Sequence, residues 1–141
     1  MTKTIVLLFA SVFCLSAGAQ NRLEVNVTNF ENNKGVCHTC IFDSEQSFVK
    51  QKPLACVLNQ VTDRKAQAIF TNVPDGTYAL FVIHDVNKNG KMDTNFLGIP
   101  KEGYGASQNK LPFAAAPKFE ANKIIVSGGV TMQLPIRLRN L

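Results

Sequence analysis

The segment from His84 to Gly105 carries oxygen-bearing side chains at regular intervals, a pattern by which a short loop can hold a calcium ion. It reads H-D-V-N-K-N-G-K-M-D-T-N-F-L-G-I-P-K-E-G-Y-G. Carboxylate or carboxamide side chains stand at positions 1, 3, 5 and 9 of a calcium loop, namely Asp85, Asn87, Asn89 and Asp93. Gly90, at position 6, permits the sharp turn that such loops make. The sequence therefore predicts a calcium site here.

Further ligands must come from outside that spacing. Position 12, where a helix–loop–helix calcium site places a bidentate glutamate, is Phe96. Glu102 is a nearby carboxylate, and Lys91 can contribute its backbone carbonyl. Because few carboxylates stand beside several lysines, we expect weak binding, on the order of 0.1–1 mM as in extracellular modules. In the alternative interpretation no metal binds, and the same polar side chains hold backbone amides in consecutive Asx turns while Gly90 takes a positive φ.

A catalytic alternative uses residues of the same segment, as a small hydrolase or isomerase built around Asp85, Asp93 and Glu102. His84 and Asp85 do not form a dyad in this interpretation, because adjacent residues on a strand point to opposite faces. The sequence contains no G-x-S-x-G, H-E-x-x-H or phosphate-loop pattern. A non-catalytic structural or binding module is therefore the favoured interpretation.

The end of the segment is a candidate binding surface for a partner protein or a glycan. Tyr104 lies between two glycines and follows Pro100, so it could present an aromatic ring at one end of the domain. In the alternative, the apolar residues of the segment fold it back onto the domain. We favour that alternative for Leu97 and Ile99.

Three cysteines lie beyond the N-terminal segment: Cys37, Cys40 and Cys56. On the strand expected at Val36–Phe42, Cys37 and Cys40 point to opposite faces about 10 Å apart. A disulfide tolerates at most about 7 Å between Cα atoms, so these two do not bridge each other. Cys56 either pairs with one of them or all three remain thiols. The same geometry argues against a zinc site that needs all three cysteines together with His38.

Residues 1–19 predict a signal peptide. Lys3 supplies a positive start, Ile5–Leu15 an apolar run, and Ala17-Gly18-Ala19 a cleavage site. Since the apolar run is shorter than the roughly 20 residues that span a bilayer, we expect an exported mature chain, 20–141, in the periplasm or outside the cell. Without Lys3, the 15 basic residues become 14 against 10 acidic ones, a net charge of +4. They are scattered singly, which argues against a nucleic-acid partner.

The elements that position these residues are predicted to be strands, because apolar and polar residues alternate with a period of two. Seven segments are expected: Leu23–Thr28, Val36–Phe42, Ala55–Val61, Ala66–Phe70, Thr77–His84, Lys123–Val126 and Met132–Leu138. Pro135 cannot donate to a strand ladder, which favours an edge position for the last segment. Ser44–Lys50 is expected to form a helical turn or two, with Phe48 and Val49 touching the core.

Two resemblances support this organisation. The segment 70–80 resembles the F-x-x-V/L-P-x-G-x-Y pattern of prealbumin-like domains, such as the regulatory domain of carboxypeptidases. The chain from Gly35 onward resembles the exported bacterial family named domain of unknown function 2141. That resemblance is carried by G-T-Y-A at 76–79, H-D at 84–85, N-G-K at 89–91, L-G-I-P at 97–100 and E-G-Y-G at 102–105. Both imply an all-β fold, and neither implies a reaction.

The expected fold is therefore an antiparallel, immunoglobulin-like or prealbumin-like β-sandwich. It has about seven strands in a single domain, 20–141. One long ordered loop, 84–105, carries the candidate site, because a loop of that length in a compact domain is usually functional.

Overall fold

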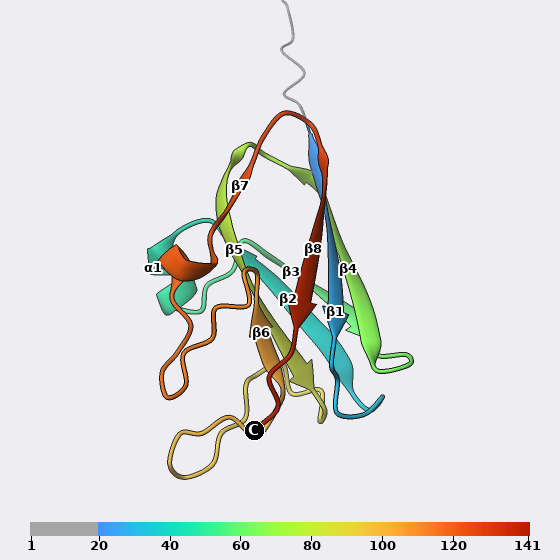
Figure 1. Cartoon of the computed structure of the whole chain (residues 1–141), viewed down its shortest axis with the longest axis vertical. Coiled ribbons are helices and arrows are strands. Elements are labelled where there is room, and N and C mark those ends of the chain that lie inside the picture. Colours follow the sequence, from blue (N-terminus) through green and yellow to red (C-terminus); the bar gives the residue numbers. More distant parts are fainter. Residues whose placement is uncertain (1–19) are drawn as a thin grey trace, which may run out of the picture.

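The computed structural model describes residues 20–141, so the signal peptide predicted for residues 1–19 lies outside the described residues. Within this range, eight strands form two sheets and two short helices lie to one side (Figure 1). The elements are β1 (Asn21–Thr28), β2 (Val36–Phe42), α1 (Glu45–Val49), β3 (Ala55–Gln60), β4 (Lys65–Val73), β5 (Gly76–Asp85), β6 (Tyr104–Ala106), α2 (Phe119–Asn122), β7 (Ile124–Val126) and β8 (Thr131–Arg137). Among the described helices, none has the length and apolar character needed to cross a bilayer.

The strands form a three-stranded sheet and a five-stranded sheet. The first has the order β4-β1-β8, and the second has the order β3-β2-β5-β6 with β7 also pairing with β5. The all-β sandwich predicted from the sequence is confirmed. The expectation of purely antiparallel pairing is wrong at one place, since β1 and β8 run parallel.

The parallel pair follows from where the chain crosses between the sheets. β7 pairs with the beginning of β5, and the turn after it brings the Val130 carbonyl to the backbone N–H of Arg22 at the start of β1. β8 therefore enters the three-stranded sheet at the same end as β1 and runs alongside it. Alternation in a sequence identifies which face of a strand is buried but carries no information on strand direction.

The core lies between the two sheets. Alternate residues of β1, Leu23, Val25 and Val27, are fully buried and pack against Leu80 and Val82 of β5 within one apolar cluster. Burial of each such side chain contributes roughly 1.5–3 kcal/mol, which explains why the period-two pattern predicts these strands. The outer position expected for the last strand is also confirmed, because β8 forms an edge of its sheet.

A second apolar cluster covers part of the outer face of the five-stranded sheet. Ser44 is the N-cap of helix α1, and its side chain accepts the backbone N–H of Ser47 while the Ser47 hydroxyl accepts that of Ser44. This capping box directs Phe48 onto Phe42. The helical turn predicted here is confirmed, as is burial of Phe48. The expectation that Val49 also touches the core is wrong, since its side chain is 72% exposed.

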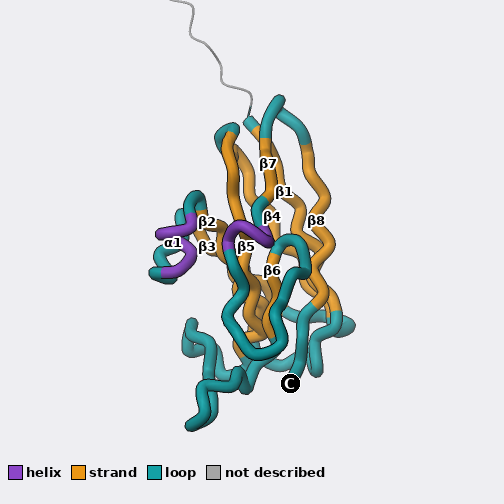
Figure 2. Tube along the Cα trace, turned by 60° about the vertical axis from the view of Figure 1, so that its left-hand side comes forward, coloured by secondary structure: helices purple, strands orange, loops and turns teal. Residues whose placement is uncertain are grey.

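The long loop is shorter than predicted. β5 continues through Asp85, and Tyr104 begins the short strand β6, which pairs with β5, so the connection spans residues 86–103. Figure 2 places loops at the end of the sandwich where the C-terminus lies. The connection is tied to that end because Tyr104 and Arg139 exchange backbone hydrogen bonds of 3.0 and 2.8 Å.

Candidate functional site

Two buried carboxylates hold the base of the 86–103 loop. Asp85 accepts backbone N–H bonds from Asn89 and Gly90, at 3.0 and 2.8 Å. Glu102 accepts the backbone N–H of Val86 at 2.9 Å through Oε1 and that of Asp93 at 3.2 Å through Oε2. Hydrogen bonds to an ionised acceptor are roughly twice as strong as neutral ones. The two carboxylates therefore fix the backbone at the beginning and in the middle of the loop.

The position of Asp85 depends on a glycine in the neighbouring strand connection. Gly35 has a φ of +71°, and a Cβ atom added there would lie 2.1 Å from the Asp85 carbonyl oxygen. Glycine takes this conformation without strain, and the lack of a Cβ atom allows the close approach. Val36 then pairs with Asp85 in the ladder between β2 and β5, which places the carboxylate at the rim of the sheet.

The middle of the loop is a set of Asx turns. Asn87 Oδ1 accepts the backbone N–H of Asn89 at 3.2 Å, and Asn89 Oδ1 accepts that of Lys91 at 2.9 Å. The carboxamide nitrogens of both asparagines donate to the Asp93 carboxylate, at 2.6 Å from Asn87 and 2.9 Å from Asn89. Gly90 has the expected positive φ, +74°. This arrangement is the geometry of the Asx-turn alternative considered from the sequence.

The structure thus separates five of the six predicted calcium ligands into two groups. Asn87, Asn89 and Asp93 converge, whereas both oxygens of Asp85 and of Glu102 are engaged by backbone amides. Lys91 takes part through its backbone N–H, which donates to Asn89.

His84 lies on the opposite side of β5 from Asp85 and belongs to the core. Its Nε2 is 2.8 Å from the Lys34 carbonyl oxygen, and because a carbonyl can only accept, Nε2 donates. The ring also makes an edge-on contact with Phe30, with centroids 4.9 Å apart. Adjacent residues on a strand point to opposite faces, so His84 faces the core while Asp85 faces the loop. The His84 ring therefore holds the connection between β1 and β2 that contains Gly35.

Leu97 and Ile99 are arranged opposite to expectation, whereas Tyr104 adopts the second of the two alternatives considered for it. Tyr104 is buried against Phe81 rather than presented at the surface, whereas Leu97 and Ile99 are exposed rather than folded back. Phe96 is 95% exposed. The physical reason is Asn95, whose Oδ1 accepts the backbone N–H of both Leu97 and Ile99 and so holds a tight turn without apolar packing.

Two of the cysteines and His38 form a cluster that was not predicted from the sequence. Cys40 of β2 and Cys56 of β3 lie directly opposite each other and form a disulfide, one of the pairings left open by the sequence. Cys37 is a free thiol that points into the core, where desolvation by burial raises its pKa to about 11. His38 lies on the same face as Cys40, with Nε2 and Sγ 3.5 Å apart. Three of the four residues considered for zinc therefore converge, and Cys37 does not.

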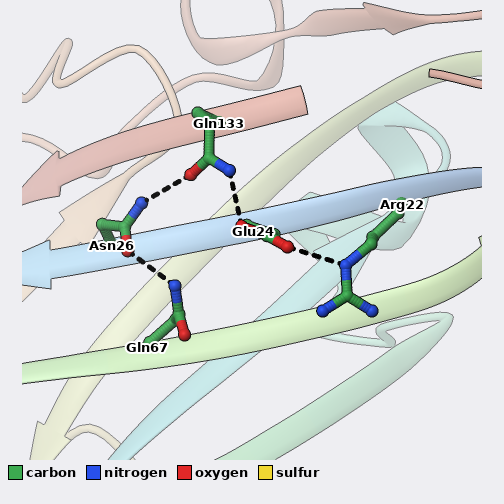
Figure 3. Close-up of polar contacts among 5 residues, drawn as sticks. All are labelled: Arg22, Glu24, Asn26, Gln67 and Gln133. Carbon is green, nitrogen blue, oxygen red and sulfur yellow. Dashed lines mark hydrogen bonds and ion pairs between the residues drawn. The ribbon is translucent and has the colours of Figure 1, made fainter. Parts of the chain in front are cut away.

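A network of paired polar side chains covers the outer face of the three-stranded sheet (Figure 3). Asn26 accepts from Gln67 of β4 and donates to Gln133 of β8. Gln133 in turn donates to Glu24, which also accepts from Arg22. The members satisfy one another across three strands, so this polar ladder presents a neutral, mutually bonded surface.

Comparison with known proteins gives one match. The family model described as an uncharacterized protein conserved in bacteria, domain of unknown function 2141, matches residues 25–133. That range contains the whole 86–103 loop and both members of the disulfide. No curated protein and no solved structure matches the chain.

Proposed function

We propose a binding role for this chain, which belongs to the bacterial family named domain of unknown function 2141. In this proposal it is an exported, non-catalytic β-sandwich module that recognises a partner protein through the tip of the 86–103 loop. The observation that carries the proposal is the combination of Phe96, Leu97 and Ile99 at the surface with a loop backbone fixed by buried carboxylates.

A fixed loop with an apolar tip is suited to recognition. Binding normally costs the conformational freedom of the segments that become ordered, and a loop held in advance avoids much of that cost. A fully exposed phenylalanine can fill a pocket on a partner, which is how aromatic anchors dominate interfaces. Lys91 and Lys101 flank this tip and are also exposed, which favours a partner surface with acidic groups around an apolar pocket.

The bonding of the carboxylates supports a non-catalytic role. The hydrolase or isomerase alternative needs Asp85, Asp93 and Glu102 to exchange protons with a substrate, and a general base must reach the proton that it takes. Asp85 and Glu102 are buried, and their oxygens accept backbone N–H bonds. Their positions suit support of the loop better than contact with a substrate.

The test compares two equally exposed phenylalanines. Phe96→Ala removes the proposed anchor, and Phe113→Ala removes a ring of 94% exposure in a different segment. The wild-type chain and both variants would be immobilised and exposed to the exported proteins of a bacterium that carries this protein. The proposal expects a protein that is retained by the wild type and by Phe113→Ala but is lost with Phe96→Ala.

Two outcomes contradict the proposal. Equal retention by Phe96→Ala would remove the loop tip from recognition. Binding to a glycan array that depends on Phe96, without any retained protein, would assign the tip to sugars instead, since aromatic rings also stack on sugar faces.

Calcium binding is a second candidate, favoured by the surroundings of Asp93. The Asp93 carboxylate accepts hydrogen bonds from the carboxamide nitrogens of Asn87 and Asn89. These two N–H donors occupy the place beside the carboxylate to which a cation would be attracted. We propose that calcium reverses these two carboxamides, whose oxygens then join the Asp93 carboxylate and the Lys91 carbonyl around the ion. Oxygen-only coordination of this kind is what calcium prefers.

Thermal unfolding with and without calcium tests this second candidate. With a dissociation constant of about 1 mM, 10 mM calcium would stabilise the folded chain by about 1.4 kcal/mol. Asp93→Asn should abolish the gain, whereas Asp63→Asn, in an exposed turn outside the 86–103 loop, should preserve it. An unchanged melting temperature against a chelator control would refute calcium binding.

Export rests on the sequence of residues 1–19 and on the Cys40–Cys56 disulfide, because disulfides persist mainly in oxidising compartments. The mass of the chain recovered from its native host tests it. The expected product begins near Gln20, and recovery of the full 141-residue chain from the cytoplasm would contradict export.

A further inference from the structure

Three potential metal ligands meet on the outer face of the five-stranded sheet. His38 and Cys40 are two residues apart on β2 and therefore share a face, and Cys56 of β3 lies opposite Cys40. The ligand atoms of these three side chains all lie within 4.8 Å of one another. Among residues 20–141 this is the one group of three or more histidine, cysteine or acidic side chains with that proximity.

The geometry fits a thiophilic metal ion. Bonds of about 2.3 Å to sulfur and about 2.0–2.1 Å to nitrogen, meeting at a tetrahedral angle, place the two ligand atoms about 3.5–3.6 Å apart. His38 Nε2 and Cys40 Sγ are 3.5 Å apart. Two thiolates that share one ion stand about 3.8 Å apart by the same construction. Directly opposite positions on paired strands, here with Cα atoms 4.1 Å apart, can supply that separation through side-chain rotation.

The cluster is accessible and its histidine has no competing partner. β3 is an edge strand, and none of the three side chains is buried, so a small reductant and an ion can approach them. His38 Nδ1 has no hydrogen-bond partner within the described part of the chain. That nitrogen is buried, whereas Nε2 already lies 3.5 Å from Cys40 Sγ and is the ring nitrogen placed to bind an ion beside the sulfur atoms.

We propose that reduction of the Cys40–Cys56 disulfide creates a binding site for one thiophilic d10 cation, Zn²⁺ or Cu⁺, held by His38, Cys40 and Cys56. An external dithiol supplies two electrons and two protons, so that the disulfide becomes two thiols and the dithiol becomes a disulfide. The cation then displaces both thiol protons to water and binds the two thiolates and the neutral imidazole. With the sulfur atoms bonded to each other no thiolate is available, so metal binding occurs only in the reduced protein.

The two ions share ligand chemistry and differ in what completes their coordination. Cu⁺ is satisfied by soft thiolates and an imidazole, whereas Zn²⁺ requires a fourth ligand, which here would be water. His38, Cys40 and Cys56 lie outside the 86–103 loop, and no side-chain hydrogen bond within residues 20–141 joins them to it. The binding role proposed for that loop can therefore fail without affecting this inference.

The experiment measures metal stoichiometry in the full mature chain, with and without prior reduction by a dithiol that is then removed under anaerobic conditions. Native mass spectrometry with Zn²⁺ and, separately, with Cu⁺ should show one ion per reduced chain and none per oxidised chain. Co²⁺ added to the reduced chain should give thiolate-to-metal charge-transfer absorption, which reports sulfur coordination directly. His38→Gln should weaken binding by at least about tenfold, since removal of even an outer-shell partner of a metal ligand costs about 10–100-fold in affinity.

Cys37→Ala is the matched control, because it removes a neighbouring thiol on β2 that faces the core. It should leave stoichiometry and affinity unchanged, whereas Cys56→Ser should abolish binding. Circular dichroism of each reduced sample establishes whether the strands persist. Binding by the oxidised chain, no ion bound to the reduced wild type, dependence on Cys37, or unfolding on reduction that the metal does not reverse would each overturn the proposal.

Discussion

On the outer face of the three-stranded sheet, side-chain amides and one ion pair bridge neighbouring strands, whereas the outer face of the five-stranded sheet carries aromatic rings, a histidine and a disulfide. The polar ladder lies open to solvent, and its members satisfy one another. The other face is covered in part by α1 and α2 through contacts of Phe42, Phe48 and Phe119. The two sheets share one core but differ in what they present outward.

The difference follows from how each sheet is flanked in the sequence. β4, β1 and β8 are joined to their neighbours by turns, and within residues 20–141 no helix packs on their outer face, which is mostly polar and carries Ile69 and Pro135 among the polar side chains. β2 and β5 are followed or approached by segments that contain Phe48 and Phe119, which bury apolar side chains on the outside of the sheet. The free energy of unfolding should therefore be sensitive to substitutions on the outer face of the five-stranded sheet and insensitive to substitutions on the outer face of the three-stranded sheet.

The largest expected effect breaks the aromatic cluster. Phe48→Ala removes a buried ring that meets Phe42 edge-on at 5.1 Å and Phe119 at 6.1 Å. The expected loss is about 3–5 kcal/mol of unfolding free energy, typical of a buried phenylalanine. Urea unfolding measures it, with Val49→Ala in the same helix as an exposed control that should change stability by less than about 0.5 kcal/mol. Equal effects of the two substitutions would contradict the buried outer cluster.

The next largest effect is expected from removal of the Cys40–Cys56 disulfide, which joins β2 and β3 of the five-stranded sheet. Its partners are 16 residues apart, and closing a loop of that length lowers the entropy of the unfolded chain by an amount equivalent to about 3 kcal/mol. Cys40→Ser with Cys56→Ser should therefore lower the unfolding free energy by about 3 kcal/mol. Leu58→Ala, on the same edge strand and exposed, is the control. A double variant as stable as the control would show that the bridge does not constrain this edge.

Cys37, whose thiol faces the core from β2, has a smaller effect on the free energy of unfolding, and only at alkaline pH. Burial raises the pKa of Cys37 from 9.0 to about 11, so the unfolded chain releases this proton at lower pH than the folded chain. Its stabilising contribution is complete below pH 9 and is lost progressively between pH 9 and 11. The slope approaches about 1.4 kcal/mol per pH unit.

Comparing the unfolding midpoints of the wild type and Cys37→Ala across this range isolates the thiol from other alkaline groups. The wild type should lose more stability than Cys37→Ala as the pH rises from 8 toward 10. Parallel curves for the two proteins would mean that the thiol is not desolvated by the fold.

The contrast between the faces also explains which features the sequence could predict. Leu23, Val25 and Val27 alternate with polar residues, so β1 and its burial follow from periodicity alone. The short strand β6 was missed because Tyr104–Ala106 is too brief for a periodic signal. Its place in the sandwich instead depends on Gly105, where a Cβ atom would lie 2.7 Å from an Ile136 methyl group across the interface.

The candidate sites were predictable to different extents. The polar spacing of Asp85, Asn87 and Asn89 does indicate a loop held by its own side chains, because Asx turns are local interactions. The exposure of Phe96 could not be read from the sequence, since it depends on how the Asn95 turn leaves the sandwich. The cluster of His38, Cys40 and Cys56 required the register between β2 and β3, which a single sequence does not contain. The face shared by His38 and Cys40, two residues apart, was the signal that could have drawn attention to it.

The smallest expected effect belongs to the polar ladder itself. Hydrogen bonds from Arg22 and then from Gln133 lower the pKa of Glu24 below its ordinary value of 4.5. Its contribution to stability is therefore present above the unfolded pKa and is lost as the pH falls through the folded pKa. Because the carboxylate is partly exposed, solvent screens the effect, and the direct measurement is an NMR titration of the Glu24 side chain. Arg22→Ala should raise its pKa more than Gln133→Ala, since the arginine has the larger influence. If neither substitution changes the pKa of Glu24, the hydrogen bonds of the polar ladder do not stabilise the ionised carboxylate. The outer face of the three-stranded sheet would then contribute even less to stability than its hydrogen bonds suggest.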